Sequence, residues 1–226
     1  MSVARLVKQQ LRYAPRYYVP VMLVYVFMML MILVKVVAIR QSDGTFLDVY
    51  FRWFDAYLLG VIFLPMSAMI TLMTVVFRPY DYLRSGSRKL LYWQLLIQAL
   101  LVQLIIWLPW AVSTLISSYA FGVISNYQVG IMFVLSTVQV FFNQLFLVLM
   151  GLIGYLTLRR KVAGLIVIIS LNLCFFSLHL SKVVTPLWKF TRSQSPLDKL
   201  VNVVILVLIS YVVSAVLLAI IKNRDY

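Results

Sequence analysis

The chain has 226 residues, of which 64% are hydrophobic, and its Lys and Arg residues give it a net charge of +14. Such an apolar composition is typical of an integral membrane protein and excludes a sizeable soluble core. The basic residues fall between long apolar runs and not on one soluble face, which favours membrane lipids over nucleic acid as partners. We therefore predict one all-α transmembrane domain over residues 1–226 and no nucleic-acid partner.

Residues 1–18 show the pattern of an amphipathic helix. On a helical wheel an apolar arc faces a basic side formed by Arg5, Lys8, Arg12 and Arg16. A helix of this kind lies in the membrane interface with its basic face toward lipid phosphates and the cytoplasm. The alternative is a disordered basic flank. No small-residue cleavage site follows, so we expect the segment to be retained.

Six apolar runs are each long enough to cross a bilayer, which takes about 20 residues. They cover residues 20–38, 54–77, 90–116, 129–158, 162–180 and 200–221. Backbone polar groups in lipid must be paired within each segment, and the alternating pattern of strands is absent, so we predict helices. Lys35, near the end of the first run, either extends toward the interface or pairs with Asp55.

The distribution of Lys and Arg predicts the orientation. The segments before the first run, between the second and third, between the fourth and fifth, and after the sixth hold most of the basic residues. Because cytoplasmic segments carry the excess of Lys and Arg, both termini are predicted to be cytoplasmic.

The polar loop at residues 78–89 lies on the predicted cytoplasmic side. Pro79 suits the first position of a helix, Gly86 suits the residue after a helix, and Ser87 suits an N-cap. This predicts a short helix over residues 79–85 that could dock onto another protein. The alternative is a basic connector in which any helix is incidental.

Polar side chains recur at helical spacing within four of the predicted spans. Those named as a candidate substrate path are Ser67, Thr71 and Thr74 in the second span, Gln94 and Gln98 in the third, and Ser136, Gln139 and Asn143 in the fourth. Such groups commonly hydrogen-bond between membrane helices, which is the default explanation. They could also line a path for cargo. The sequence leaves both interpretations open.

Residues 181–199 precede the sixth span on the predicted outer side. The segment holds Pro186, Trp188 and Phe190 among several basic residues. Its mixture of aromatic and cationic side chains suits a segment that lies on the outer interface or dips into it. An ordinary loop is the alternative.

Several residue patterns of enzymes and pumps are missing. The sequence has no P-loop motif for ATP, and with one His, one Cys and no Glu it lacks the ligands and general base of a metal-dependent intramembrane protease. Ion-coupled carriers usually place a carboxylate within the membrane, but Asp55 lies at the edge of its span. We therefore predict no catalytic residue, no metal site and no enzymatic activity on this chain.

The stretch LRSGSRKLLYW at residues 83–93 resembles the loop of small Gram-positive permeases associated with bacteriocin or lantibiotic export and immunity. The order of an amphipathic helix, six spans with both ends inside, a capped helix after the second span and an amphipathic segment before the sixth is similar to the permease subunit of type-2 ABC exporters. The architecture covers the whole chain, and the short motif covers about a dozen residues.

The resemblance implies a function for each segment. Residues 1–18 correspond to a connecting helix, and residues 78–89 to a coupling loop that contacts a separate ATPase subunit. The contacting residues implied are Tyr80, Asp81, Tyr82, Leu83, Arg84, Ser85 and Gly86. The chain itself needs no cofactor, since ATP and Mg²⁺ belong to the ATPase. The Glu common in the family's coupling region is absent; either Asp81 replaces it or the contact is aromatic and cationic.

We expect, on this basis, the membrane subunit of an ATP-driven exporter in a bacterial plasma membrane. Its partners are an ABC ATPase, a second permease (an identical or related chain) and membrane lipids. The apolar spans suit an amphiphilic cargo, such as a peptide or bacteriocin, a drug or a lipid. The alternative is a stand-alone membrane protein for binding, immunity or signalling that transports nothing.

Overall fold

The computed structural model describes residues 46–75, 88–120, 127–183, 185–192 and 195–223, together with single positions between residues 22 and 37. Several predictions lie outside the described residues. These are the interfacial helix with Arg5, Lys8, Arg12 and Arg16, most of the first span, the pairing of Lys35, and the candidate ATPase contacts from Tyr80 to Gly86. They therefore stay predictions.

The described part of the chain is helical and contains no strand. Its elements are α3 (Phe46–Trp53), the π-helix η1 (Ala56–Phe63), α4 (Leu64–Thr74), α6 (Arg88–Ala120), α7 (Tyr127–Leu158), α8 (Lys161–Leu180), the 3-10 turn η3 (Lys189–Thr191) and α9 (Pro196–Asn223). Five helical stretches are long and apolar enough to cross a membrane. They coincide with the second to sixth predicted spans and indicate a helical membrane protein.

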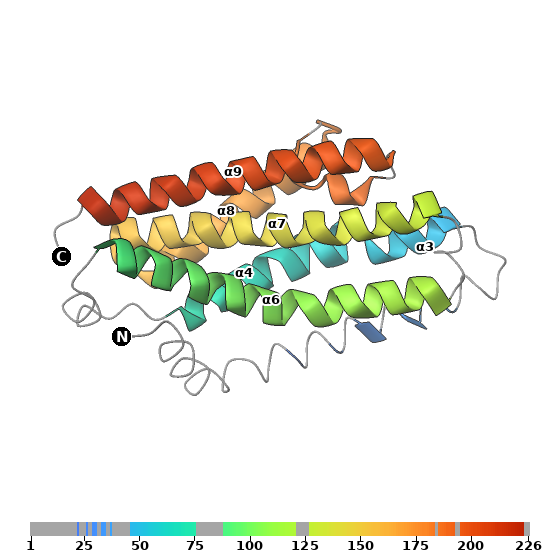
Figure 1. Cartoon of the computed structure of the whole chain (residues 1–226), viewed down its shortest axis with the longest axis horizontal. Helices are drawn as coiled ribbons and strands as arrows, with labels where there is room; N and C mark the ends of the chain where they lie inside the picture. The colour runs from blue at the N-terminus through green and yellow to red at the C-terminus, as the bar shows by residue number, and fades with distance from the viewer. Residues whose placement is uncertain are drawn as a thin grey trace.

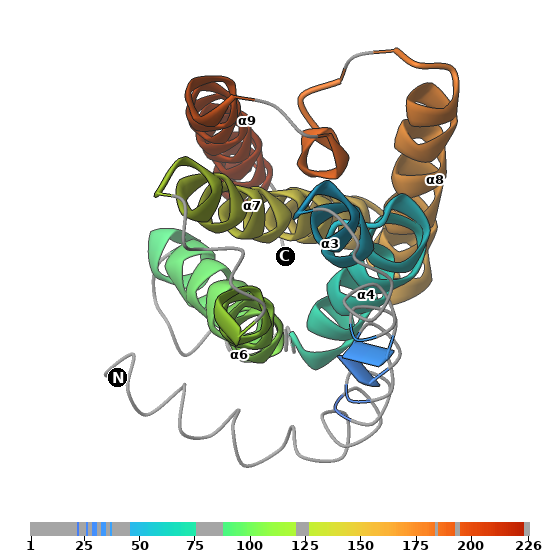
Figure 2. The same cartoon turned by 90° about the vertical axis from the view of Figure 1, so that its right-hand side faces the viewer.

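Helix α7 lies at the centre of the bundle. It contacts α4, α6, α8 and α9, which surround it. Figure 1 shows the long helices running roughly along one axis, and Figure 2 shows the same bundle from one end, with η3 between α8 and α9. We call the end that carries α3 and η3 the η3 end. The end at which α4 and α9 finish and α6 begins is called the loop end.

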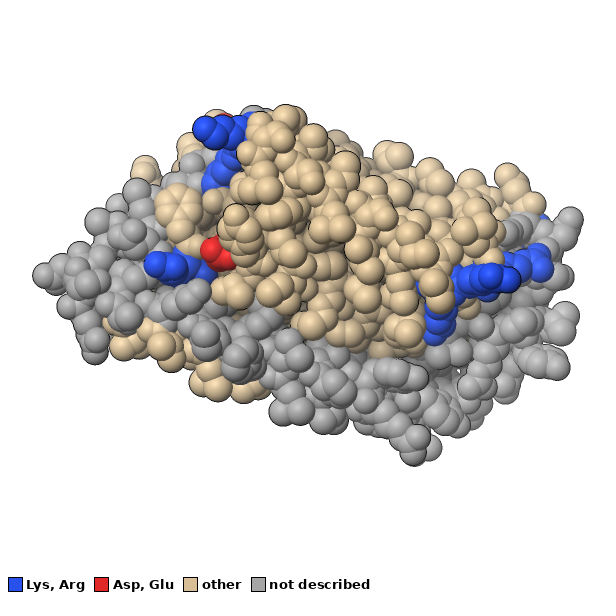
Figure 3. All heavy atoms as spheres, turned by 180° about the vertical axis from the view of Figure 1, so that it is seen from behind, with Lys and Arg blue, Asp and Glu red and all other residues tan. Residues whose placement is uncertain are grey.

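Charged side chains gather at the two ends of the bundle. Figure 3 shows Lys and Arg at both ends of one face, with a band of uncharged residues between them. Large apolar side chains such as Ile116, Tyr211 and Val212 are exposed on the described surface. An apolar belt between charged ends is the surface that a bilayer requires. The arrangement agrees with helices that cross the membrane.

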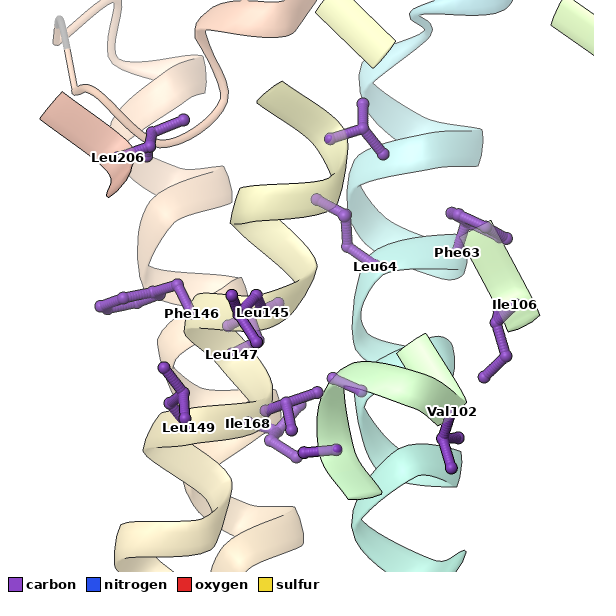
Figure 4. Close-up of a cluster of buried hydrophobic side chains, with 14 of the residues drawn as sticks. Phe63, Leu64, Val102, Ile106, Leu145, Phe146, Leu147, Leu149, Ile168 and Leu206 are labelled. Carbon is purple, nitrogen blue, oxygen red and sulfur yellow. The ribbon is translucent and has the colours of Figure 1, made fainter. Parts of the chain in front are cut away.

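The interior is closely packed, and glycines bring α7 and α8 together. Figure 4 shows part of the cluster of buried apolar side chains, which includes Leu147 of α7 and Ile168 of α8. A Cβ atom on Gly151 would lie 2.6 Å from Cδ1 of Ile168, and one on Gly164 would lie 2.5 Å from the Gly151 carbonyl oxygen. Membrane helices associate through such close packing because lipid provides no hydrophobic drive between them.

The second span begins as a π-helix, which the sequence did not predict. Asp55 is its N-cap, since its carboxylate accepts hydrogen bonds from the backbone N–H groups of Tyr57 and Leu58, each 2.8 Å long. The backbone N–H of Leu64 donates to the Leu59 carbonyl, five residues earlier. The next bond of this kind would join Pro65 to Gly60, but proline has no N–H. The side-chain amide of Asn172 donates to the Gly60 carbonyl instead, at 3.0 Å.

Candidate functional site

The polar residues predicted as a candidate path are all in the interior. Ser67, Thr71, Thr74, Gln94, Gln98, Ser136, Gln139 and Asn143 are each at most 9% exposed. They come from the central helix α7 and from two of the helices around it, α4 and α6. A polar side chain inside a membrane bundle requires a hydrogen-bond partner, so the partners show what each residue does.

Residues of α4 bond to both neighbouring helices. The Gln144 side-chain amide donates to the Ser67 hydroxyl at 3.1 Å, which joins α7 to α4. The Thr71 hydroxyl lies 2.8 Å from the Ser67 carbonyl and 3.0 Å from Oε1 of Gln103, which joins α4 to α6. Ser67 and Thr71 thus connect three helices. Together with Gln103 and Gln144 they form one buried layer.

This layer has more hydrogen-bonding groups than partners. Nε2 of Gln103 and Oε1 of Gln144 are buried without a partner, as are both amide atoms of Gln98, which also lies on α6. The Thr71 hydroxyl also carries a single proton for its two neighbouring oxygens. Unpaired buried polar atoms cost free energy, and an interior that contains them can accept water or a polar group of a ligand.

The polar residues of α7 meet the segment of residues 185–192, which includes η3 and which we call the η3 segment. Ser136 lies 3.0 Å from the Tyr50 hydroxyl, and that hydroxyl also lies 2.6 Å from the Phe190 carbonyl oxygen. The Asn143 side-chain oxygen accepts a hydrogen bond from the backbone N–H of Trp188 at 3.3 Å. Two of the three predicted α7 residues therefore contact this segment, directly or through Tyr50.

Gln139, the third, contacts the first turns of α9. Its amide nitrogen donates to the Lys199 carbonyl at 3.1 Å, and its amide oxygen lies 3.5 Å from Nζ of Lys199. Lys199 itself is fully buried. Its ammonium group also lies 2.7 Å from the Tyr50 hydroxyl, 2.9 Å from the Lys189 carbonyl and 3.4 Å from the Phe190 carbonyl.

The η3 segment is held against the bundle by its aromatic side chains as well. Trp188 and Phe190 are 3% and 0% exposed, so they pack inside the protein and not into lipid. Trp188 has a left-handed backbone with φ of 71°, which is uncommon for a residue other than glycine. Asn202 of α9 adds a further tie by donating to the Pro186 carbonyl at 3.0 Å.

The remaining predicted path residues are Thr74 of α4 and Gln94 and Gln98 of α6. Thr74 donates to the Thr71 carbonyl of its own helix at 2.8 Å. Gln94 and Gln98 are buried on α6, and Gln98 has no partner for its amide. The eight residues therefore do not form one continuous chain of hydrogen bonds.

Basic residues connect helix ends at the loop end. Nζ of Lys161, the first residue of α8, donates to the Met73 carbonyl in the last turn of α4 at 2.8 Å. The Arg88 guanidinium, at the start of α6, donates to the Lys222 carbonyl near the end of α9. A cation at a helix C-terminus pairs with free carbonyl groups and with the negative end of the helix dipole.

Sequence reasoning missed Lys199, whose ammonium group lies within 3.5 Å of four oxygen atoms. The sequence places Lys199 among the outer cations because it lies between the fifth and sixth predicted spans. The spacing of Lys199, Asn202, Leu206 and Ser210 was the available signal, since these residues share one face of α9 and all are buried. Asn172 and Tyr50 carried no such signal, because their partners are backbone carbonyls far away in the sequence.

No group of His, Cys, Asp or Glu suited to a metal ion occurs among the described residues. No family model, curated protein or solved structure matches this chain. The arrangement that the structure does present is a membrane bundle whose apolar core also holds buried polar side chains. The η3 segment covers one end, and cations connect helices at the other end.

Proposed function

We propose that this chain is the membrane permease subunit of an ATP-driven exporter that moves an amphiphilic cargo together with a separate ATPase. The cargo class would be a peptide or bacteriocin, a drug or a lipid. The permease would act as a pair of identical or related chains in a bacterial plasma membrane. The proposal begins from the basic sequence at residues 78–89 and its resemblance to exporter loops.

The observation that carries the proposal is the pair of contacts at the loop end. Residues 76–87 connect α4 to α6, and Lys161 and Arg88 bond the ends of α4 and α9 to the starts of α8 and α6. A displacement of this connection would therefore act on four helices at once. That property suits a segment through which an ATPase moves a membrane bundle.

In this mechanism the ATPase pulls on residues 78–89 when its nucleotide sites close. The helix ends tied by Arg88 and Lys161 would follow, and the layer formed by Ser67, Thr71, Gln103 and Gln144 would change its pairing. The unpaired amide atoms of this layer lower the free-energy cost of changing hydrogen-bond partners, since a new bond can replace one that is lost. Packed bundles change between discrete arrangements, so a small pull can select another one.

The test is to purify the tagged full chain from its own host in mild detergent and measure co-purified ATPase activity. The variant is Leu83→Glu with Arg84→Glu, which replaces an apolar and a cationic residue in the predicted coupling loop. We expect the ATPase to be lost or its activity to fall by about tenfold, the effect of losing a few charge-assisted contacts.

The matched control is Leu197→Glu with Lys182→Glu, which makes the same change of charge at exposed positions of the η3 end. It should leave the ATPase bound. An ATPase that stays bound and equally active with the loop variant would overturn the proposal, as would a chain that purifies alone at native expression levels.

The second candidate function is a stand-alone membrane protein for binding, immunity or signalling. The observation that favours it is the use of the predicted path residues: Ser67, Thr71, Ser136, Gln139 and Asn143 all bond to other parts of this chain. Residues that act only as ties between helices need no transport role. Co-purification separates the two candidates, since only the transporter requires an ATPase.

A further inference from the structure

The buried ammonium group of Lys199 lies in a cage made only of neutral oxygen atoms. Four oxygens lie within 3.5 Å: the Tyr50 hydroxyl, the carbonyls of Lys189 and Phe190, and the Gln139 side-chain oxygen. No ion pair joins Lys199 to a carboxylate among the side chains that the structure describes; Asp198 bonds to Ser195 instead. Within the described part of the chain, the charge is thus balanced by dipoles.

Burying an ammonium group costs free energy, and the surrounding protein must offset that cost. Transferring an ammonium ion from water to a protein interior costs several kcal/mol, which hydrogen bonds to well-placed oxygens must offset. Two of the four oxygens belong to the backbone of the η3 segment, and a third, the Tyr50 hydroxyl, donates to the Phe190 carbonyl. The favourable interactions of the cation therefore depend on this segment being in place.

The η3 segment covers the polar residues of α7 that lie at the η3 end. Trp188 contacts Asn143, and Phe190 reaches Ser136 through Tyr50. Figure 2 shows the segment lying between α8 and α9 at the η3 end. Its only regular structure is the three-residue turn η3, and Trp188 has an unfavourable left-handed backbone. Such a segment stays in place through its contacts and not through its own secondary structure.

We propose that Lys199 is the latch of a lid: its ammonium group, held in the oxygen cage, keeps the η3 segment closed over Ser136, Gln139 and Asn143. Without the ammonium group, the carbonyls of Lys189 and Phe190 lose their shared donor, and the segment opens to water. The inference concerns a closed and an open arrangement of one segment. It does not depend on ATP, cargo or the proposed transport function.

The test measures how fast a thiol under the lid reacts with a water-soluble maleimide. Cys174, which is exposed, is first replaced by Ser, and Leu187, 5% exposed within the segment, is replaced by Cys. The full chain is studied in lipid vesicles, with Lys182→Cys as an exposed reference thiol. We expect Lys199→Met to raise the rate at position 187 by about tenfold or more and to leave the reference unchanged.

The matched control is Lys189→Met. Lys189 contributes its backbone carbonyl to the cage, so this variant removes a nearby positive charge and keeps every cage oxygen. It should leave the thiol at position 187 protected. Equal rates for Lys199→Met and the parent chain would overturn the proposal, and so would an equal increase with Lys189→Met.

A second variant distinguishes loss of the ammonium group from a general loss of structure. Lys199→Ala removes the ammonium group from the cage and leaves room for a small ammonium ion. Added n-propylammonium should therefore restore protection of the thiol. Tetramethylammonium at the same concentration cannot donate hydrogen bonds and should not. Where Lys199 variants do not fold, Tyr50→Phe removes the hydroxyl and should raise the rate. Restoration by both cations, or a protected thiol in Tyr50→Phe, would contradict the latch.

Discussion

The indole ring of Trp188 lies directly on the backbone of Gly60: a Cβ atom at Gly60 would be 2.3 Å from the nearest ring carbon. No real contact is that short, so only glycine admits this ring at its present position. Because Gly60 belongs to the π-helix and Trp188 to the η3 segment, the pair connects the second span to the lid. Gly60 is required for close approach and not for an unusual backbone angle.

Gly60→Ala should therefore move Trp188 away from η1. Overfilling a packed interior costs about 1–3 kcal/mol, so we expect thermal unfolding in detergent at a lower temperature. The thiol at position 187 should also react faster. Ile62→Ala, at an exposed position of the same π-helix, is the control and should change the free energy of unfolding by no more than about 0.5 kcal/mol. An unchanged melting temperature for Gly60→Ala would contradict the contact.

Asn172→Leu should destabilise the chain because it leaves the Gly60 carbonyl unpaired. The expected loss is about 1–3 kcal/mol in the free energy of unfolding. Ser170→Ala, at an exposed position of α8, is the matched control and should have little effect. The sharper measurement is a double-mutant cycle with Pro65→Ala, which restores an N–H within reach of the Gly60 carbonyl. Asn172→Leu should cost less in the Pro65→Ala background, and simple additivity would contradict our account.

Thr71 and Gln103 provide a test of the two interpretations of the polar stripes. If their hydrogen bond only joins helices, Thr71→Val with Gln103→Leu should cost less stability than the sum of the single variants, with a coupling of about 0.6 kcal/mol. The transport activity of each variant would then fall only as far as its stability falls. If the layer serves cargo, the double variant should lose transport while its melting temperature is retained. Thermal unfolding and cargo export measured on the same variants decide between these outcomes.

Lys161→Met should loosen the end of α4 at the loop end. The lost interaction between the cation and the Met73 carbonyl is expected to cost about 0.3–1 kcal/mol, as for other cations at helix C-termini. Proteolysis between α4 and α6 should become faster. Arg160→Met removes the neighbouring exposed charge and should not have this effect. Equal cleavage rates for both variants would show that general charge, and not this contact, protects the connection.

The spans of this protein could be predicted because each one is a long apolar run. Length and hydropathy suffice to recognise a membrane helix, and α6 to α9 cover the predicted ranges with ends shifted by a few residues. The π-helix could not be predicted in this way. It depends on the capping of its start by Asp55 and on the pairing of Gly60 with Asn172, more than a hundred residues away.

The polar residues show a similar division. Helical spacing identified Ser136, Gln139 and Asn143 as one buried face of α7, but spacing says nothing about the partner of each. The sequence predicts Lys199 to lie in the outer loop, because the apolar run of the sixth span begins only at residue 200. Its burial follows from oxygens that Tyr50, Gln139 and the η3 segment bring together only in the folded chain.

The π-helix has a consequence for how the chain length could vary. In η1 a backbone N–H bonds to the carbonyl five residues earlier, where an α-helix uses the carbonyl four residues earlier. The π-helix therefore contains one residue more than an α-helix would in its place. Removing one residue between positions 56 and 63 could convert η1 to the α form while α4 keeps Ser67 and Thr71 toward its neighbours. The same deletion in the middle of α6 would turn everything beyond it by about 100° around the axis. Natural variants of this protein should therefore tolerate a change in length in η1 and not in α6.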